Sequence, residues 1–508
     1  RIRRAFTDRR FYRGGSSTRK EKGMDNQRYN VLFIQTDQWS QNFMGYRGCS
    51  EIMTPTIDQL ARDGVIYTNC YSTCPVCIPA RRSLMTGMSP RSHGDRVYSD
   101  RMKMPEAKTL AQAFSDAGYQ TVAVGKLHVY PQRNRIGFNE VILQEEGRYE
   151  FGVLDDYQIW LAENGAVGQE FSHAMGNNTY YTTPWPLERR MHPTVWTTAQ
   201  MVRQIQRRDP TRPSFFYLSY QFPHPPLVPL KEYLDMYKDE DITLPPAGDW
   251  VDDSFIMKEM TESGRHYSDR EIKLAKKAYF AQCTLIDHQI RLVLGALREN
   301  GILDNTLIVF ASDHGEMLFQ HKMAGKRSFY ENSSHIPLLF SGKPVASLRG
   351  KKDTRLACLE DIMPTLLEFC KIPVPDTSEG ENLFGERKRQ VLFGEISEGP
   401  RATRMIHDGR FKLIYYPWGN RIQLFDLEQD PMEMKDLSGR SEVRQIQEAL
   451  EKELMQQLYG EDVNWISDGK LTGVEAPKYR EKADYGFSNQ RGLHWPVVMP
   501  VSKDSAGS

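Results

Sequence analysis

The sequence has few cysteines, no excess of charge of either sign and no long apolar run in its 508 residues. Lys and Arg number 66, as do Asp and Glu, so the composition gives no reason to expect a nucleic-acid partner. A membrane partner is not expected either, because no apolar run approaches the roughly 18 residues of a membrane-spanning helix. Seven cysteines, an odd number in a long chain, fit a reducing compartment better than a disulfide scaffold. We therefore expect a cytoplasmic protein, with a periplasmic location left open if residues precede Arg1.

Short apolar segments alternate with helical patterns through most of the chain. Residues 29–36 form an apolar run that ends at Asp37, as expected of a buried strand that delivers a polar side chain at its carboxyl end. Further strands are expected at 65–71, 121–125, 215–220 and 306–312, and helices at 56–62, 109–117 and 269–300. This alternation predicts an α/β fold with a mixed, mainly parallel sheet sandwiched by helices.

The pattern changes near residue 391, where short strands follow one another closely. Turn-forming Asp408-Gly409 and Gly419-Asn420 separate them, which predicts a small antiparallel sheet. The expected strands are 391–396, 403–409, 410–416 and 422–427, followed by a helix at 442–459. We therefore divide the chain into a disordered tail or upstream translated sequence (1–23), a large α/β domain (24–385), an antiparallel-sheet subdomain (386–465) and a C-terminal tail (466–508).

The most informative motif, CIPARRSLMTG, runs from Cys77 to Gly87. Proline suits the first turn of a helix, so we expect Cys77 just before a helix N-terminus, where free N–H groups favour an anion. Arg81, one turn further on, adds positive charge on the same face. The alternative for Cys74 and Cys77 is half of a zinc site or a redox pair, but no second pair of cysteines has the spacing that such a zinc site needs.

The motif from Cys77 to Gly87 resembles the signature of the sulfatase family, in which Cys-x-Pro-x-Arg and a following Thr-Gly mark a cysteine that is oxidised to formylglycine. The resemblance implies a formylglycine-generating enzyme as a partner during maturation. It also implies an alkaline phosphatase-like fold, with 24–385 as the catalytic domain, and hydrolysis of a sulfate monoester. One hydroxyl of the hydrated aldehyde would attack and the other would help to expel sulfate, a step that a thiol cannot perform.

Two acidic motifs occupy corresponding places after two strands of the expected sheet. Asp37-Gln38 follows the first strand, and Asp313-His314 follows a late one. The resemblance implies that these residues and modified Cys77 bind one divalent cation, usually Ca²⁺. Mg²⁺ stays open because of the oxygen donors, and Mn²⁺ or Zn²⁺ because of the imidazole. The commonest family pattern has Asp in place of Gln38 and Asn in place of His314, so the ligand set here carries less negative charge.

Three further motifs resemble family elements that handle the sulfate group and protons. Lys126 and His128 end a strand in the sequence GKLH, and in an extended segment both would point the same way. The resemblance implies that Lys126 bridges formylglycine and sulfate and that His128 takes a proton when sulfate leaves. It also implies that His224, in a proline-rich loop, protonates the leaving alcohol and that Lys326 grips a sulfate oxygen.

Two other functions stay open at this point. A phosphonate monoester hydrolase or phosphodiesterase of the same superfamily would share the Cys77 motif, and Gln38 with His314 resembles the metal site of that group. Lys126 and His128 favour the sulfatase pattern instead. A sulfatase-like binding protein whose Cys77 is never oxidised is the non-enzymatic alternative.

Substrate choice is expected to depend on loops. The segment 138–198 is rich in aromatic residues that would suit stacking on a sugar or aryl ring, although core packing explains them equally well. They include Trp160, Trp185, Trp196, Tyr149, Tyr157, Tyr180 and Tyr181. We expect a small-molecule or carbohydrate sulfate ester as the substrate and leave a homo-oligomer open. His93 and His321 are expected in loops, with a modest chance of lining the pocket.

Overall fold

The computed structural model describes residues 28–147, 153–261, 267–387 and 389–481. Its centre is an eight-stranded sheet in the order β5-β4-β6-β1-β7-β8-β2-β9. All neighbouring strands are parallel except at β8, which runs antiparallel to both β7 and β2. The mixed, mainly parallel sheet is therefore confirmed. Its strands are β5 Glu140–Leu143, β4 Gln120–Gly125, β6 Ser214–Pro223, β1 Asn30–Asp37, β7 Thr306–Ser312, β8 Leu338–Ser341, β2 Val65–Tyr67 and β9 Lys351–Asp353.

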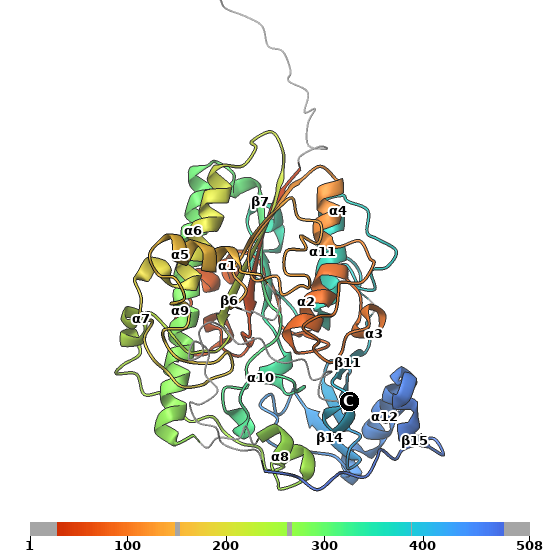
Figure 1. Ribbon diagram of the computed structural model, residues 1–508. Coiled ribbons are helices and arrows are strands. Elements are labelled where there is room, and N and C mark those ends of the chain that lie inside the picture. Colours follow the sequence, from red (N-terminus) through yellow and green to blue (C-terminus); the bar gives the residue numbers. More distant parts are fainter. Residues whose placement is uncertain (1–27, 148–152, 262–266, 388, 482–508) are drawn as a thin grey trace, which may run out of the picture.

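Helices cover both faces of this sheet (Figure 1). Leu32 and Ile34 of β1 belong to an apolar cluster with α1 Pro55–Asp63, α6 Pro193–Gln206 and α9 Asp269–Glu299. Val31 and Phe33 belong to a second cluster with α2 Cys77–Thr86, α4 Leu110–Asp116 and α11 Ile362–Phe369. Successive side chains of a strand point to opposite faces, so β1 contributes to both cores and lies deep in the molecule. The shorter helices are α3 Pro90–His93, α5 Asp156–Glu163, α7 Lys231–Met236, α8 Phe255–Thr261 and α10 Glu331–Ser334.

A four-stranded antiparallel sheet follows in the C-terminal part, as expected. Its strands, in order, are β11 Leu392–Ile396, β12 Thr403–His407, β13 Phe411–Tyr416 and β14 Arg421–Asp426. One face packs on α12 Arg444–Gln457 through Leu413, Leu450 and Leu454. The other face packs against the large sheet's domain, where Ile414 joins a cluster that includes Tyr330. The small sheet is thus sandwiched between α12 and the large domain.

Lys412 joins the small sheet to the large domain through a buried ion network. Its Nζ lies 2.7 Å from Glu331 Oε1 and 2.7 Å from Glu433 Oε1. His335 Nδ1 lies 2.7 Å from Glu331 Oε2, and all four residues are buried. Buried charges are tolerated only when they are paired, so this network makes the position of the small sheet specific.

The expected strand at 65–71 is wrong in one respect, because it divides in two. β2 belongs to the large sheet, whereas β3 Cys70–Tyr71 pairs with β10 Ala357–Cys358 in a separate two-stranded sheet. The break falls at Asn69, whose Nδ2 donates to the Thr354 carbonyl oxygen at 2.7 Å. Beyond α12, β15 Ile466–Ser467 and β16 Lys470–Leu471 form a short hairpin, and Val474 bridges to Trp418.

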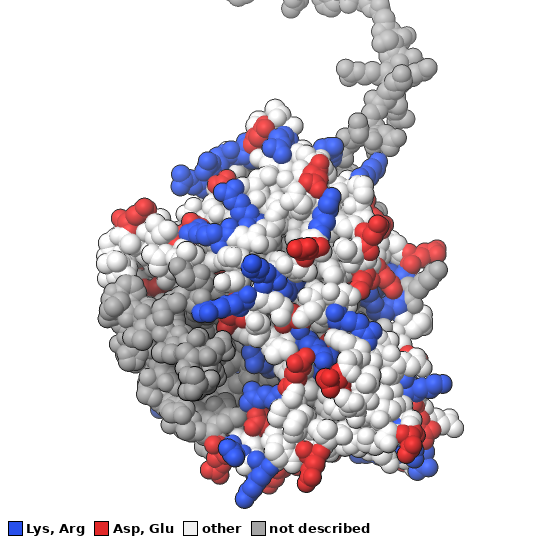
Figure 2. Space-filling view, turned by 45° about the vertical axis from the view of Figure 1, so that its right-hand side comes forward, with Lys and Arg blue, Asp and Glu red and all other residues white. Residues whose placement is uncertain are grey.

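Positive and negative side chains are interspersed over the face that Figure 2 presents. This mixture agrees with the balanced composition. Within the described ranges, no helix is long and apolar enough to cross a bilayer.

Candidate active site

Two aspartates lie side by side at the carboxyl edge of the large sheet. β1 pairs with β7 in parallel register, with Thr36 opposite Ser312. Asp37 is the last residue of β1 and Asp313 directly follows β7, so their side chains emerge at the same edge. Both are fully buried, and the Gln38 backbone N–H donates to Asp313 Oδ1 at 3.1 Å. Two residues far apart in the sequence thereby share one site.

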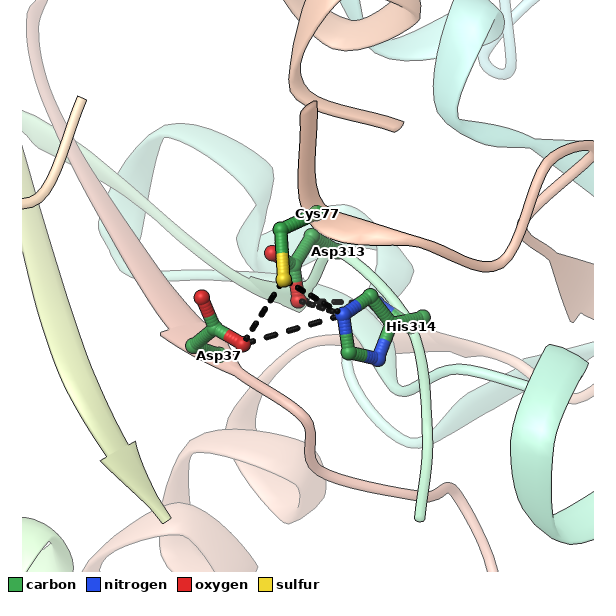
Figure 3. A group of neighbouring side chains, drawn as sticks. All are labelled: Asp37, Cys77, Asp313 and His314. Carbon is green, nitrogen blue, oxygen red and sulfur yellow. Dashed lines mark hydrogen bonds and ion pairs between the residues drawn. The ribbon is translucent and has the colours of Figure 1, made fainter. Parts of the chain in front are cut away.

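Cys77 is the first residue of α2, and its side chain points at the two aspartates. The expectation that Cys77 precedes the helix is wrong by one residue, because Val76 is the N-cap and Pro79 is the third helical residue. Proline is tolerated there since the first N–H groups of a helix have no partner within it. Cys77 Sγ lies 3.6 Å from Asp37 Oδ1 and 3.1 Å from His314 Nε2 (Figure 3).

Asp37, Cys77, Asp313 and His314 form a buried group whose ligand atoms all lie within 4.8 Å of one another. His314 Nε2 is 3.7 Å from one oxygen of each aspartate. Ligands about 2.0 to 2.6 Å from one cation, at right angles to each other, lie about 3 to 4 Å apart, so these separations suit one divalent ion. His314 Nδ1 faces the Gly315 carbonyl oxygen at 3.0 Å. A proton on Nδ1 would therefore direct the Nε2 lone pair at the group, as a metal ligand requires.

The amide of Gln38, the further expected ligand, is engaged outside this group. Its Oε1 accepts a hydrogen bond from Lys326 Nζ at 2.6 Å. Its Nε2 donates to Glu316 and, at 3.2 Å, to the Tyr180 hydroxyl. The ligand role of Gln38 therefore stays a prediction.

Arg81 ties the two aspartates to the neighbouring strand ends. Its Nε donates to Asp313 Oδ2 at 2.9 Å and its Nη2 to Asp37 Oδ2 at 3.1 Å. Its Nη1 donates to the Lys126 carbonyl oxygen at 2.9 Å and to Ser219 Oγ at 3.0 Å. The sequence predicts that Arg81 and the helix start together bind an anion. In the structure, however, the buried guanidinium of Arg81 already donates its hydrogen bonds to oxygens of the protein. The catalytic role expected of Arg81 stays a prediction.

Lys126 is fully buried beside the first aspartate. Its Nζ lies 2.6 Å from Asp37 Oδ2 and 2.8 Å from Glu146 Oε1. Burial and the Cys77 sulfur raise the pKa of Asp37, but neighbouring cations, of which Lys126 is the strongest, lower it to about 2. Asp37 is therefore an anion at neutral pH.

The backbone around Lys126 and His128 forms a turn and not the expected extended strand. Gly125 has φ +105°, and a Cβ there would lie 1.9 Å from the Ser219 carbonyl oxygen, so only glycine fits. His128 has φ +60°, and its N–H donates to Glu145 Oε1 at 2.9 Å, as does that of Leu127 at 2.8 Å. Lys126 and His128 therefore reach one site because Glu145 stabilises a tight turn, and not because alternate residues of a strand point the same way.

His128 lies near the Cys77 sulfur. Its imidazole is one of the groups that lower the pKa of the Cys77 thiol, and its ring lies edge-on to Tyr98 with 5.9 Å between centroids. Burial raises the pKa of the Cys77 thiol, but Lys326 and Lys126 lower it well below its ordinary value. The position is therefore strongly favourable to negative charge.

His224 and Lys326 meet in the same pocket from two different loops. Lys326 Nζ donates to His224 Nε2 at 2.6 Å. His224 Nδ1 lies 2.6 Å from the Pro225 carbonyl oxygen and 3.8 Å from Glu146 Oε1. The ring therefore presents Nε2 to the ammonium group of Lys326. This arrangement is suited to proton transfer to a bound substrate.

The chain from residue 29 to residue 372 matches the family model described as Sulfatase. The chain belongs to the sulfatase family. Residues 319–459 match the model described as the C-terminal part of N-sulphoglucosamine sulphohydrolase. An arylsulfatase from Clostridium perfringens is 36% identical over 466 residues, which cover 87% of this chain and 97% of that protein. A choline-sulfatase from Rhizobium meliloti is 27% identical and covers 80% and 82%.

Solved structures share the fold of this sulfatase. A phosphonate monoester hydrolase from Silicibacter pomeroyi has a TM-score of 0.71 at 23% identity and covers 84% of this chain and 94% of its own. A protein in complex with its substrate D-glucosamine-2-N,6-O-disulfate has a TM-score of 0.69 at 21% identity, with 84% and 97% covered. The expected alkaline phosphatase-like fold is therefore confirmed.

Three acidic residues of the site in this sulfatase were not predicted from the sequence. Glu145 and Glu146 follow β5, which lies beside β4, so a pair of acids after a neighbouring parallel strand was the available signal. Glu316 closes the motif that begins at Asp313, and Oε2 of Glu316 accepts from the Tyr180 hydroxyl at 2.6 Å. This contact of Tyr180 had no local signal, because it depends on packing.

Other expected residues lie elsewhere in the fold. His93 contacts Ser83 Oγ at 3.2 Å, and His321 Nδ1 accepts from the Gly248 N–H at 3.0 Å. Neither lines the cavity at Cys77. Cys74 is buried, with Sγ 3.8 Å from the Arg96 carbonyl oxygen, and the described cysteines are all free, so the cysteine pair is not a disulfide. Of the aromatic residues expected as a pocket wall, Trp160, Trp185, Trp196, Tyr157 and Tyr181 pack in or against the core, Tyr149 lies outside the described residues, and Tyr180 lines the cavity.

A cavity of about 600 Å³ opens over Cys77, His224 and Lys326. One wall is apolar and includes Met260 and Met323, while Asn177 and Asn178 add polar side chains. Thr403 of the small sheet also contributes, as do Ser397 and Arg401 from the segment between β11 and β12. The cavity is large enough for a substrate with an extended alcohol portion.

Proposed function

We propose that this sulfatase hydrolyses a sulfate monoester to an alcohol and sulfate, with a formylglycine derived from Cys77 as the nucleophile. The observation that carries this proposal is the buried contact of Cys77 with Asp37 and His314 at the floor of the cavity. When present, the formylglycine hydrate supplies a hydroxyl that attacks sulfur and a second hydroxyl whose deprotonation expels the sulfate.

Asp37, Asp313 and His314 fit one divalent cation in donor chemistry, in spacing and in their shared burial. Burial and Asp37 raise the pKa of Asp313 against the opposing effects of His314 and Arg81, as expected where two carboxylates lie close together. We propose Ca²⁺, with Mn²⁺ or Mg²⁺ as the alternatives, and Gln38 as a further ligand. A bound divalent cation supplies positive charge beside Cys77.

The side chains around Cys77 divide the remaining tasks. Lys326 lines the cavity and Lys126 lies buried beside Asp37, so that their ammonium groups are suited to bind sulfate oxygens. His224, whose Nε2 lies within hydrogen-bond distance of Lys326, is suited to protonate the leaving alcohol. His128, which helps to lower the pKa of the Cys77 thiol, is suited to take the proton from the second hydroxyl.

The test combines peptide mass spectrometry with a substrate panel. Protein produced together with a formylglycine-generating enzyme should show an aldehyde in place of the Cys77 thiol and should hydrolyse aryl sulfates. Cys77→Ala should abolish turnover and leave the unfolding midpoint nearly unchanged. Turnover by the alanine variant would contradict a covalent role, and an intact thiol without activity would favour the binding-protein alternative.

A phosphonate monoester hydrolase or phosphodiesterase is the second candidate. Gln38 and His314 favour it, whereas Lys126 and His128 favour sulfate. The panel should therefore include phenyl phosphonate and a phosphodiester. A rate constant kcat/KM for either that clearly exceeds the value for the sulfate would replace the leading proposal.

The cellular location, the domain bounds and the partners of the chain are proposals as well. We propose a cytoplasmic enzyme, a catalytic domain over 24–385, an antiparallel-sheet subdomain over 386–465 and a tail over 466–508. The substrate would be a small-molecule or carbohydrate sulfate ester, and the maturation partner a formylglycine-generating enzyme.

A further inference from the structure

The cavity over Cys77 continues into a second cavity of about 870 Å³. Four residues line both of them, namely Glu259, Arg327, Ser397 and Arg401. The second cavity extends from there to the chain at 477–480. An alcohol portion that extends from Cys77 toward the second cavity therefore passes these four residues.

The two arginines that line both cavities differ in their ion pairing. Arg401 is paired, since its Nε and Nη2 lie 2.8 and 2.7 Å from Glu259 Oε2. Arg327 is exposed, and within the described part of the chain its guanidinium makes no ion pair. Its one described side-chain contact is the face of the Tyr98 ring, 5.3 Å from the ring centroid. Contact with a ring face leaves the in-plane N–H donors of a guanidinium available to a planar or tetrahedral anion.

The backbone holds Arg327 beside the reactive centre. Its N–H donates to the Pro75 carbonyl oxygen at 3.1 Å, two residues before Cys77, and its φ is +72°. The preceding residue, Lys326, reaches the cavity floor, where it contacts His224. The ring of Tyr98 also lies beside His128, so it links Arg327 to the same floor. The chain thus places one cation at the sulfate position and the next at the junction of the two cavities.

Resting on the proposed sulfatase activity, we propose that Arg327 determines substrate specificity by binding a second anionic group on the alcohol portion. The preferred substrates are then sulfate esters of acidic alcohols, which carry a carboxylate or a further sulfate. A cationic ester such as choline sulfate is disfavoured, because the positive charge of Arg327 repels its trimethylammonium group. Tyr98 keeps the guanidinium in place.

The test uses full-length, metal-loaded protein that contains formylglycine. Aryl sulfates that differ only in the end group of one tether serve as probes: a carboxylate, a sulfate or a neutral carboxamide, with tethers of several lengths. Wild type should show a kcat/KM for an anionic probe roughly 10- to 100-fold above the carboxamide, as charged hydrogen bonds allow. The carboxylate and sulfate arms identify which anion is preferred.

Arg327→Gln should remove that preference and change kcat/KM for the carboxamide by less than about 3-fold. Arg327→Lys keeps the charge but not the fork of donors and should retain part of the preference. Arg62→Gln, at an exposed position on α1, is the matched control and should keep all of it. Added salt should weaken the preference, because a partly exposed ion pair is screened.

The outcomes separate this inference from the function on which it rests. If wild type hydrolyses the carboxamide probe and shows no preference for any anionic probe, Arg327 is not a specificity residue. An equal loss on all probes in Arg327→Gln would also exclude that role. If the loaded wild type hydrolyses none of the sulfate esters, the proposed function fails and the inference fails with it.

Discussion

Replacing Arg81 by methionine should destabilise the metal-free protein by about 3 to 5 kcal/mol. The side chain is 3% exposed, and its guanidinium lies between two carboxylates that are fully buried. Methionine has a similar length but no donor, so Asp37 and Asp313 would each lose a charged hydrogen bond without gaining water. The expected loss is the cost of leaving a buried charge without its partner.

The assay is urea unfolding in EDTA, followed by circular dichroism. A double-mutant cycle with Asp313→Asn isolates the charge effect, since the amide leaves one fewer anion for Arg81 to neutralise. We expect Arg81→Met to cost at least about 1 kcal/mol less in the Asp313→Asn background than in wild type. Arg62→Met is the control and should stay within about 0.5 kcal/mol of wild type. Divalent cation should reduce the loss, because it supplies the missing positive charge.

Two results would refute this reasoning. A loss below about 1 kcal/mol in EDTA would mean that the aspartates do not depend on Arg81. An equal loss in the Asp313→Asn background would mean that packing, and not charge, is what Arg81 contributes.

Three further predictions concern other parts of the structure. His224→Ala should lower kcat by roughly 10² to 10⁴ for alkyl sulfates and far less for activated aryl sulfates, and equal losses across leaving groups would remove its role as an acid. Lys412→Met should cost about 3 to 5 kcal/mol in urea unfolding because it strands Glu331 and Glu433, whereas exposed Lys343→Met should cost little; similar effects of the two would contradict a buried network. Because the pKa of Asp37 falls from 3.8 to about 2 on folding, its ionised form should stabilise the metal-free protein by about 2 kcal/mol above pH 4, and this stability should be lost as the pH falls toward 2. The stability gap between wild type and Asp37→Asn should shrink over that pH range, and a constant gap would contradict the lowered pKa.

Local patterns in the sequence were sufficient for most of the architecture. The apolar run at 29–36 and the run at 306–312 became β1 and β7, because a continuous apolar segment that ends in a polar residue is typical of a buried parallel strand. The end of β1 and the start of α2 then placed Asp37 and Cys77 within contact distance. The residues of the Cys77 motif were sufficient to indicate the family.

The turn at Lys126 shows where local reasoning stopped. Period-two alternation applies only to extended backbone, and the backbone from Gly125 to His128 is not extended. Its shape depends on Glu145, which lies 17 residues away from His128 and accepts its N–H. The identities of Lys126 and His128 indicated the site, while the shape of the turn depended on Glu145 after the neighbouring strand β5.

The sequence was sufficient to predict several strands of the large sheet, including β1 and β7, and the four strands of the small sheet. It also predicted that Cys77 lies at a helix start and indicated the family. Tertiary structure alone decided that Lys326 contacts Gln38 across 288 positions, that Arg81 is consumed by two aspartates and that Arg327 stands between two cavities. The physical reason is that periodicity and turn preference act over a few residues, whereas the partner of a buried charge is set by which strand ends and loops pack together.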